Sequence, residues 1–259
     1  MRKLLLFAFL FICIYQNANT QVVGGTYEKL AKLYNQGKYE NCLFKADNLT
    51  YKPESTNDAE PYLYIAMCFY QLSLSEDPII QEDYSDGVKQ AIKYAARFIK
   101  KDKEGVMYTE NIEFINLLKE IQKNEIKTLF DKGEYRKAAT SAKLFDKLNK
   151  DEDLVLLYFI GINGVMSNNL TQGTRDIEEA TTKLNEVFSK GTYKTDPFIN
   201  TFAISGFLKY SEYMVNQGNV ADALKQLEMA LKIYPNDGYL KLQYNVIKQN
   251  LENKTENKE

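Results

Sequence analysis

Carboxylates are the groups in this chain with the clearest potential for chemistry. Acidic residues cluster in the run Asp151–Asp153 and in the pair Glu178-Glu179. Such clusters can bind a metal ion or act as general acids and bases. The chain contains no His, which removes the commonest general base and a common metal ligand. Acidic residues in the first turn of a helix also interact favourably with the helix dipole. We therefore expect both clusters to be structural, with no catalytic residue, metal or cofactor.

Motifs of the common enzyme classes are also missing. The sequence has no Gly-rich phosphate loop, no Ca²⁺-binding loop and no nucleophile elbow. An enzyme that uses carboxylates or Lys stays an alternative. The sequence favours a protein without enzymatic activity.

Two cysteines, Cys42 and Cys68, follow the first twenty residues. In an exported protein they could form a disulfide. Each lies on the apolar side of an expected helix, where a free thiol behaves as a small hydrophobic side chain. Two buried thiols are therefore the favoured interpretation. Sequence alone does not show whether the two Cα atoms come within bridging distance.

The first twenty residues have the pattern of a secretory signal peptide. Met1–Lys3 is a basic start, residues 4–14 are apolar, and Ala18 and Thr20 are small. A bilayer span needs roughly 20 apolar residues, so the apolar run is too short for a permanent anchor. We expect residues 1–20 to be removed and the chain to be exported. In a bacterium it would reach the periplasm or the outer envelope.

The charge of the chain argues against nucleic acid as a partner. There are 33 basic and 35 acidic residues, and loss of Arg2 and Lys3 with the signal peptide would make the balance more acidic. A nucleic-acid-binding domain normally carries a basic excess. The remaining length is sufficient for one or two domains with a sizeable core.

Three short segments share one pattern of residue types. Each has a polar residue, a Gly two positions later, a bulky residue two further and a small residue after three more. Gly can adopt the left-handed conformation that ends a helix, and the small residue lets the next helix pack closely. A repeated helix–turn–helix unit predicts a stacked helical array. The segments are Asn35–Cys42, Asp131–Ala138 and Asn216–Ala223.

Apolar residues recur with helical spacing on both sides of these turns, and no stretch alternates with the period of a strand. The fold class is therefore all-α. Two further turns are expected near residues 79 and 171, and the apolar segment 154–166 is expected to be a helix buried on nearly all sides. The expected helix pairs are 27–36 with 38–49, 59–75 with 82–100, 110–132 with 135–148, 154–166 with 174–189, and 197 to the Gly218 turn with 220–234, followed by a closing helix and a disordered tail at 254–259.

The segment Phe207–Pro235 resembles a tetratricopeptide repeat. It has aromatic residues in its first helix, Gly218 at the turn, the small residues Ala223 and Ala230 in its second helix, and Pro235 after it. The segments around Gly37 and Gly133 share the turn and lack the closing Pro. The resemblance implies an α-solenoid of about five antiparallel helix hairpins with a C-terminal capping helix, over residues 21–253.

The resemblance also implies a class of function. In this family the first helices of successive repeats line a concave groove that holds peptides or partner proteins, and catalysis is rare. The corresponding candidates here are Tyr34, Lys123, Lys127, Phe130, Glu212 and Asn216. Ordinary solvated surface is the alternative explanation for them. No set of cations on neighbouring helices matches Lys123 and Lys127, so a peptide C-terminal carboxylate is not the expected ligand.

The expected function is that of an exported scaffold or adaptor that binds a protein or peptide in such a groove. The alternative is a structural subunit of an outer-membrane assembly or secretion machine, peripherally associated with an envelope complex. In either case no membrane-spanning segment is expected in the mature chain.

Overall fold

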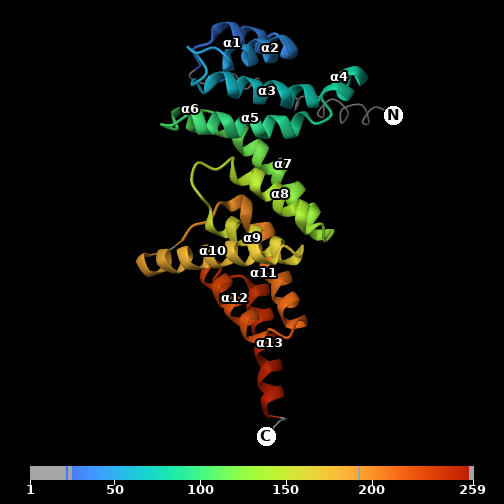
Figure 1. Cartoon of the computed structure of the whole chain (residues 1–259), viewed down its shortest axis with the longest axis vertical. Coiled ribbons are helices and arrows are strands. Elements are labelled where there is room, and N and C mark those ends of the chain that lie inside the picture. The colour runs from blue at the N-terminus through green and yellow to red at the C-terminus, as the bar shows by residue number, and fades with distance from the viewer. Residues whose placement is uncertain (1–21, 23–24, 192, 257–259) are drawn as a thin grey trace, which may run out of the picture. The chain divides into compact units, whose positions relative to one another are not determined.

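The computed structural model describes residue 22, residues 25–191 and residues 193–256 (Figure 1). The expected signal peptide, residues 1–20, lies outside the described residues, as do residues 257–259. The described part of the chain forms thirteen helices and no strand. The expected all-α class is therefore confirmed. Among the described helices, none combines the length and the apolar composition that a bilayer span requires.

The chain forms two compact units, and the division falls within one helix. Unit 1 ends at Phe114 and unit 2 begins at Ile115. Both residues belong to α7 (Ile112–Asp131), so a continuous helix contains the boundary.

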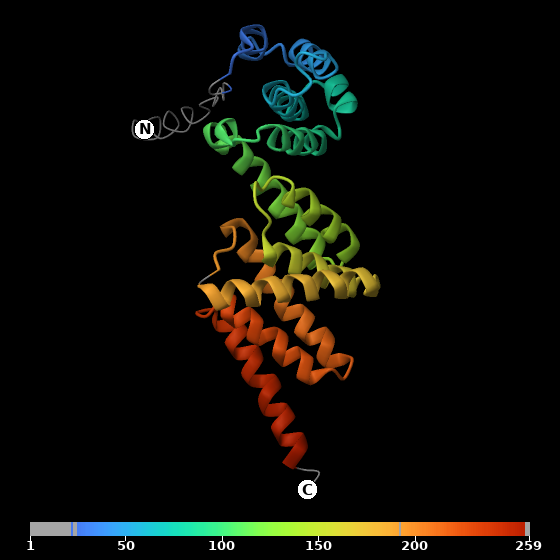
Figure 2. The ribbon, with the colours of Figure 1, turned by 60° about the vertical axis from the view of Figure 1, so that its left-hand side comes forward.

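Unit 1 is organised around its third helix. Figure 2 shows α3 lying between α2 and α5, and α3 also contacts α1 and α4. Nearly the whole of α3 is buried, including Leu63, Ile65 and Met67. Its first residue, Glu60, is also buried and accepts hydrogen bonds from the backbone N–H groups of Thr26 (2.6 Å) and Tyr27 (2.9 Å) before α1. The helices of this unit are α1 (Glu28–Asn35), α2 (Tyr39–Thr50), α3 (Glu60–Ser73), α4 (Pro78–Asp83), α5 (Gly87–Lys101) and α6 (Val106–Glu110).

Unit 2 has a corresponding central helix, α9. It packs against α8, α10 and α11, and ten of its thirteen residues, among them Val155, Phe159 and Ile162, are buried. The expectation of a helix buried on nearly all sides is confirmed. After α7, the helices of this unit are α8 (Tyr135–Asp146), α9 (Leu154–Met166), α10 (Leu170–Lys190), α11 (Pro197–Asn216), α12 (Val220–Ile233) and α13 (Gly238–Glu256).

Four of the helix pairs are joined by the same turn. Gly37, Gly133 and Gly218 have φ angles of 70°, 75° and 83°, so the expected left-handed glycines are confirmed. In each turn the residue directly after the left-handed one donates its backbone N–H to the carbonyl oxygen of the residue five positions earlier. This is the Schellman arrangement that closes a helix. The N···O distances are 3.0 Å for Lys38–Leu33, 2.9 Å for Glu134–Leu129, 2.9 Å for Asn169–Gly164 and 2.9 Å for Asn219–Met214.

The fourth of these turns, between α9 and α10, was expected near residue 171, but not as a copy of the repeated turn. Its left-handed residue is Asn168, with a φ of 67°, because Asn tolerates this conformation better than most residues. The turn therefore lies at 168 rather than near 171, and α10 begins at Leu170 rather than at 174.

In each of these turns a small buried residue lies five positions after the left-handed residue. Cys42, Ala138 and Ala223 are fully buried, and Gly173 occupies the same position in α10. A Cβ atom on Gly173 would lie 2.5 Å from the backbone nitrogen of Val165 in α9. The small residue thus sets how closely the second helix packs against the first.

Two short helices were missed, and two boundaries differ from expectation. Asp77 caps α4 by accepting a hydrogen bond from the N–H of Ile79 at 2.9 Å, so residues 78–83 form a separate helix and α5 begins at Gly87 rather than at 82. The other missed helix is α6. Helix α13 continues to Glu256, beyond the boundary expected at residue 253.

Candidate functional site

Unit 1 contains a cleft of about 950 Å³ at the C-terminal end of α5. Its walls come from the end of α2 and the segment after it, the first turn of α3, the last turn of α5, and α6. Four of the lining side chains are cations, and several others are aromatic or apolar. The cations are Arg97, Lys100, Lys101 and Lys103, and the aromatic and apolar residues include Tyr51, Tyr62, Val106 and Met107.

Hydrogen bonds hold the walls of this cleft in place. The Lys101 Nζ donates to Asn57 Oδ1 at 3.0 Å and lies 5.8 Å from the centre of the Tyr62 ring. This joins the end of α5 to the segment before α3. On the other side, the Asp102 carboxylate accepts a hydrogen bond from the Tyr108 N–H at 2.6 Å, which fixes α6 against the end of α5.

Three of the four cations of the cleft, Arg97, Lys100 and Lys103, are exposed. Among the described residues, no ion pair joins Arg97, Lys100 or Lys103 to a carboxylate. Arg97 lies over the ring of Tyr94, with its Cζ 4.6 Å from the ring centre. Cations near a helix C-terminus are favoured by the helix dipole, so the last turn of α5 can hold them without acidic partners. The cleft is suited to an anionic group.

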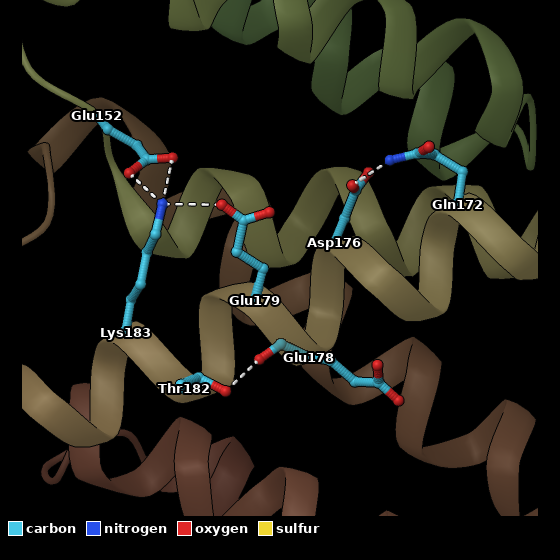
Figure 3. A network of polar contacts seen from close by, with 7 residues as sticks. All are labelled: Glu152, Gln172, Asp176, Glu178, Glu179, Thr182 and Lys183. Carbon is cyan, nitrogen blue, oxygen red and sulfur yellow. Dashed lines mark hydrogen bonds and ion pairs between the residues drawn. The ribbon is translucent and has the colours of Figure 1, made fainter.

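A smaller cleft of about 360 Å³ lies in unit 2 between α8, the α9–α10 turn and α10. Figure 3 shows two of its lining residues, Gln172 and Asp176, side by side on α10. Asp176 is 7% exposed and accepts a hydrogen bond from the Gln172 side-chain amide at 2.5 Å. This acid therefore already has a partner within its own helix.

The acidic clusters of the sequence belong to structural networks. Figure 3 shows Lys183 between Glu152 and Glu179, with N···O distances of 2.8 Å to each. The hydrogen bonds to Glu152 and then Glu179 raise the pKa of Lys183. In turn, the hydrogen bond from Lys183 lowers the pKa of Glu179. Glu178 contributes its backbone carbonyl, which accepts from the Thr182 hydroxyl at 2.9 Å.

Asp153 has the most hydrogen bonds of the acidic run. It is 7% exposed and caps α9 by accepting from the N–H groups of Val155 (2.9 Å) and Leu156 (3.1 Å). It also accepts from the Tyr193 hydroxyl at 3.0 Å and from the Asp196 N–H at 2.8 Å. A carboxylate engaged in this way stabilises the start of α9, in agreement with the expected interaction at a helix N-terminus.

Two of the six expected groove residues lie in the hydrophobic cores. Tyr34 and Phe130 are each 5% exposed, and their rings contact other aromatic rings, that of Tyr39 for Tyr34 and that of Phe159 for Phe130. Each stands three residues before a turn glycine. This position faces the second helix of the pair, so these side chains pack inward instead of lining a surface.

The other four expected groove residues are polar and lie in unit 2, on α7 and α11. Lys123 pairs with Glu120 at 2.6 Å and Lys127 pairs with Asp131. Glu212 lies 3.7 Å from Lys209, and Asn216 is exposed. Lys123 Nζ lies 5.9 Å from the centre of the Phe198 ring of α11, but among the described residues no ion pair joins Lys123 or Lys127 to Glu212.

The two cysteines of unit 1 are buried, free thiols, as the sequence favoured. Burial, followed by the neighbouring Cys42 thiol, raises the pKa of Cys68, which favours the neutral thiol over the thiolate. Among the described residues, no group of three or more Cys, Asp or Glu is placed to hold a metal ion.

No protein-family model matches the chain, and no curated protein is significantly similar to it in sequence. The resemblance to the tetratricopeptide repeat therefore stays a prediction.

Proposed function

We propose that the protein is an exported scaffold or adaptor that binds a protein or peptide partner through stacked helix hairpins of tetratricopeptide type. The observation that carries this proposal is the Schellman turn found at four helix pairs, each followed five residues later by a small buried residue. Repeated hairpins of this kind build extended surfaces whose common use is protein binding.

The surface available to a partner differs from the one the sequence suggested. Tyr34 and Phe130 are core residues, which leaves Lys123, Lys127, Glu212 and Asn216 as groove candidates in unit 2. Unit 1 adds the cleft at the end of α5, whose volume of about 950 Å³ is sufficient for several side chains of a peptide.

A second candidate, a structural subunit of an envelope assembly, is favoured by α13. Tyr239, Leu242 and Val246 lie at helical spacing on this helix and are 73%, 63% and 45% exposed. Its inner residues Leu240 and Ile247 are buried. The last helix of a solenoid normally has a polar outer face, so an apolar stripe at this position suits a permanent neighbour.

Affinity purification of the tagged full-length protein from its native envelope, after mild cross-linking, tests the proposal. We expect one or a few proteins to co-purify in constant proportion. Recovery of the protein alone, with and without cross-linker, would contradict it. Cell fractionation separates the two candidates, because an adaptor is expected in the soluble exported fraction and an assembly subunit with the membranes.

A further inference from the structure

We propose that the exposed face of α5 and the cleft at its C-terminal end bind an acidic peptide segment of the partner protein. This inference rests on the proposed function and assigns it a surface and a ligand chemistry. That surface lies on the second helix of a pair, outside the set of groove residues suggested by the sequence.

The composition of α5 is the first observation. Between Gly87 and Lys101 there are five cations and no acidic residue, although the chain as a whole is acidic. Ala91, Ala95 and Phe98 are fully buried, and α5 packs against α3. Helical periodicity places the cations on the opposite side, where four of them are exposed. These four are Lys89, Lys93, Arg97 and Lys100.

Helix stability does not explain this arrangement. Like charges four residues apart destabilise a helix by a few tenths of a kcal/mol for each pair, and Lys89, Lys93 and Arg97 have this spacing. The helix dipole favours cations only in the last turn. Lys89 lies in the first turn of α5, where the dipole disfavours it. A basic stripe that the helix itself does not need is explained by an anionic ligand.

No ion pair among the described residues neutralises the stripe, since none of the five cations of α5 forms one. Two acidic residues line the cleft, Asp102 and Glu104, and Asp102 is engaged by the Tyr108 N–H at 2.6 Å. The stripe therefore presents a positive potential to solvent, which attracts an acidic partner and speeds its association.

The shape and lining of the cleft favour a peptide. Tyr51 and Val106 are 77% and 53% exposed and line the same cleft as Arg97 and Lys100. A peptide can place an apolar side chain on such a surface and its carboxylates on the neighbouring cations. A membrane surface fits less well, because an interfacial helix inserts its apolar face and that of α5 is packed in the core.

Fluorescence anisotropy with the full-length protein and a labelled peptide tests the inference. The probe is a twelve-residue peptide of Asp and Glu with one central Phe, and a peptide with Lys at the acidic positions is the control. We expect the acidic peptide alone to bind, with an affinity that falls as salt screens the charges. The triple variant Lys93→Glu, Arg97→Glu, Lys100→Glu should weaken binding about tenfold or more, since each reversal replaces attraction by repulsion.

A matched variant and a neutral one control for net charge and for folding. Lys232→Glu, Lys241→Glu and Lys248→Glu change three exposed cations of unit 2 and should leave peptide binding within about twofold, because the charge change is the same and the surface is different. The double variant Arg97→Gln, Lys100→Gln removes positive charge without adding negative charge. Thermal unfolding verifies that each variant is folded.

Three results would overturn the inference: equal binding of both peptides, equal loss in the unit 2 variant, or binding only to anionic vesicles or an oligonucleotide. Purification of the native partner with the α5 triple variant separates this inference from the proposed function. If the partner is still recovered, the α5 surface is wrong and the scaffold function stands. If the unmodified protein also recovers no partner, the proposed function itself is contradicted.

Discussion

At the scale of single residues, two carboxylates with little exposure to solvent stabilise the starts of helices in unit 2. Asp153 caps α9, and Asp196 caps α11 by accepting from the Phe198 N–H at 3.0 Å. Asp196 also pairs with the buried Lys119 at 2.8 Å, whose Nζ lies 5.8 Å from the centre of the Phe145 ring. The Lys119–Asp196 pair therefore connects α7 to the start of α11 within unit 2.

Lys119→Met is expected to lower the free energy of unfolding by about 3 kcal/mol, because it removes the buried cation that pairs with the Asp196 carboxylate, whose side chain is only 17% exposed. The exposed pair of Lys127 and Asp131 in the same helix provides the comparison. Lys127→Met should cost about 0.5 kcal/mol or less. Urea denaturation of both variants measures the two losses of unfolding free energy. Equal losses would show that the Lys119–Asp196 pair stabilises the protein no more than the exposed pair does.

Asp146 gives a prediction with a defined pH dependence. Burial, and then repulsion from Glu152 and Asp153, raises the pKa of this carboxyl. The folded protein therefore binds this proton more tightly than the unfolded chain, and the resulting stability is lost as pH rises through the pKa of Asp146 in the folded state. Asp146→Asn should raise the melting temperature at pH 7, and the gain should shrink as the pH is lowered toward 3.8, the ordinary pKa of Asp.

Glu134 is the control of opposite sign. Its hydrogen bond from Lys137 lowers the pKa of the Glu134 carboxyl, which favours the folded state at neutral pH. Glu134→Gln should therefore lower the melting temperature slightly at pH 7, and this difference should disappear in acid. A gain at pH 7 in both variants would point to a general effect of reduced negative charge.

At the scale of helices, the repeated turn is the feature that connects sequence to structure most directly. Three of the four copies were predictable because Gly marks the left-handed residue. The copy at Asn168 was missed, although Leu170 and Gly173 stand at the positions of the bulky and the small residue. Allowing Asn in place of Gly would have identified it. The short helices α4 and α6 were missed because a single turn shows no periodicity.

Gly218→Ala should destabilise the protein by about 1–2 kcal/mol through the backbone alone. The φ of 83° at Gly218 suits Gly and opposes a Cβ atom, while no neighbouring atom lies within 4 Å of that Cβ position. Gly238 also has open space around it but no left-handed backbone. Gly238→Ala should be neutral or slightly stabilising. Thermal unfolding of the two variants measures the cost of placing a Cβ atom on a left-handed backbone. Equal melting temperatures would contradict the turn geometry.

Ala223→Leu tests the small residue that follows the same turn. Ala223 is fully buried at the start of α12, so Leu should overpack the contact and cost about 1–3 kcal/mol. Ala221 lies two residues earlier in the same helix and is exposed. Ala221→Leu should change stability by about 0.5 kcal/mol or less. An unchanged melting temperature for Ala223→Leu would contradict the close packing of α11 and α12.

At the scale of the whole molecule, sequence periodicity predicted the class of fold and most helices, but neither the division into two units nor the cleft. Periodicity is local, whereas the cleft combines the ends of α2 and α5, the start of α3, and α6. The basic composition of α5 was the available signal, since five cations without an acidic residue are visible in the sequence between Gly87 and Lys101. The expected groove failed at Tyr34 and Phe130 because the resemblance gave no information on which face of each helix packs inward.

The two compact units predict separate responses to core mutations. Leu63 is fully buried in unit 1 and Leu156 in unit 2, and replacing either by Ala should cost about 2–5 kcal/mol. Because each unit buries its own apolar residues, we expect each loss to be confined to the unit that contains the mutation.

The chain has no Trp, so a single Trp placed at Tyr62 or at Tyr213 reports on the unfolding of one unit. Urea unfolding should show that Leu63→Ala shifts the Tyr62→Trp transition and leaves the Tyr213→Trp transition in place, with the reverse for Leu156→Ala. A common shift of both transitions would show that the chain unfolds as a single cooperative array, as expected for a solenoid whose neighbouring repeats are strongly coupled.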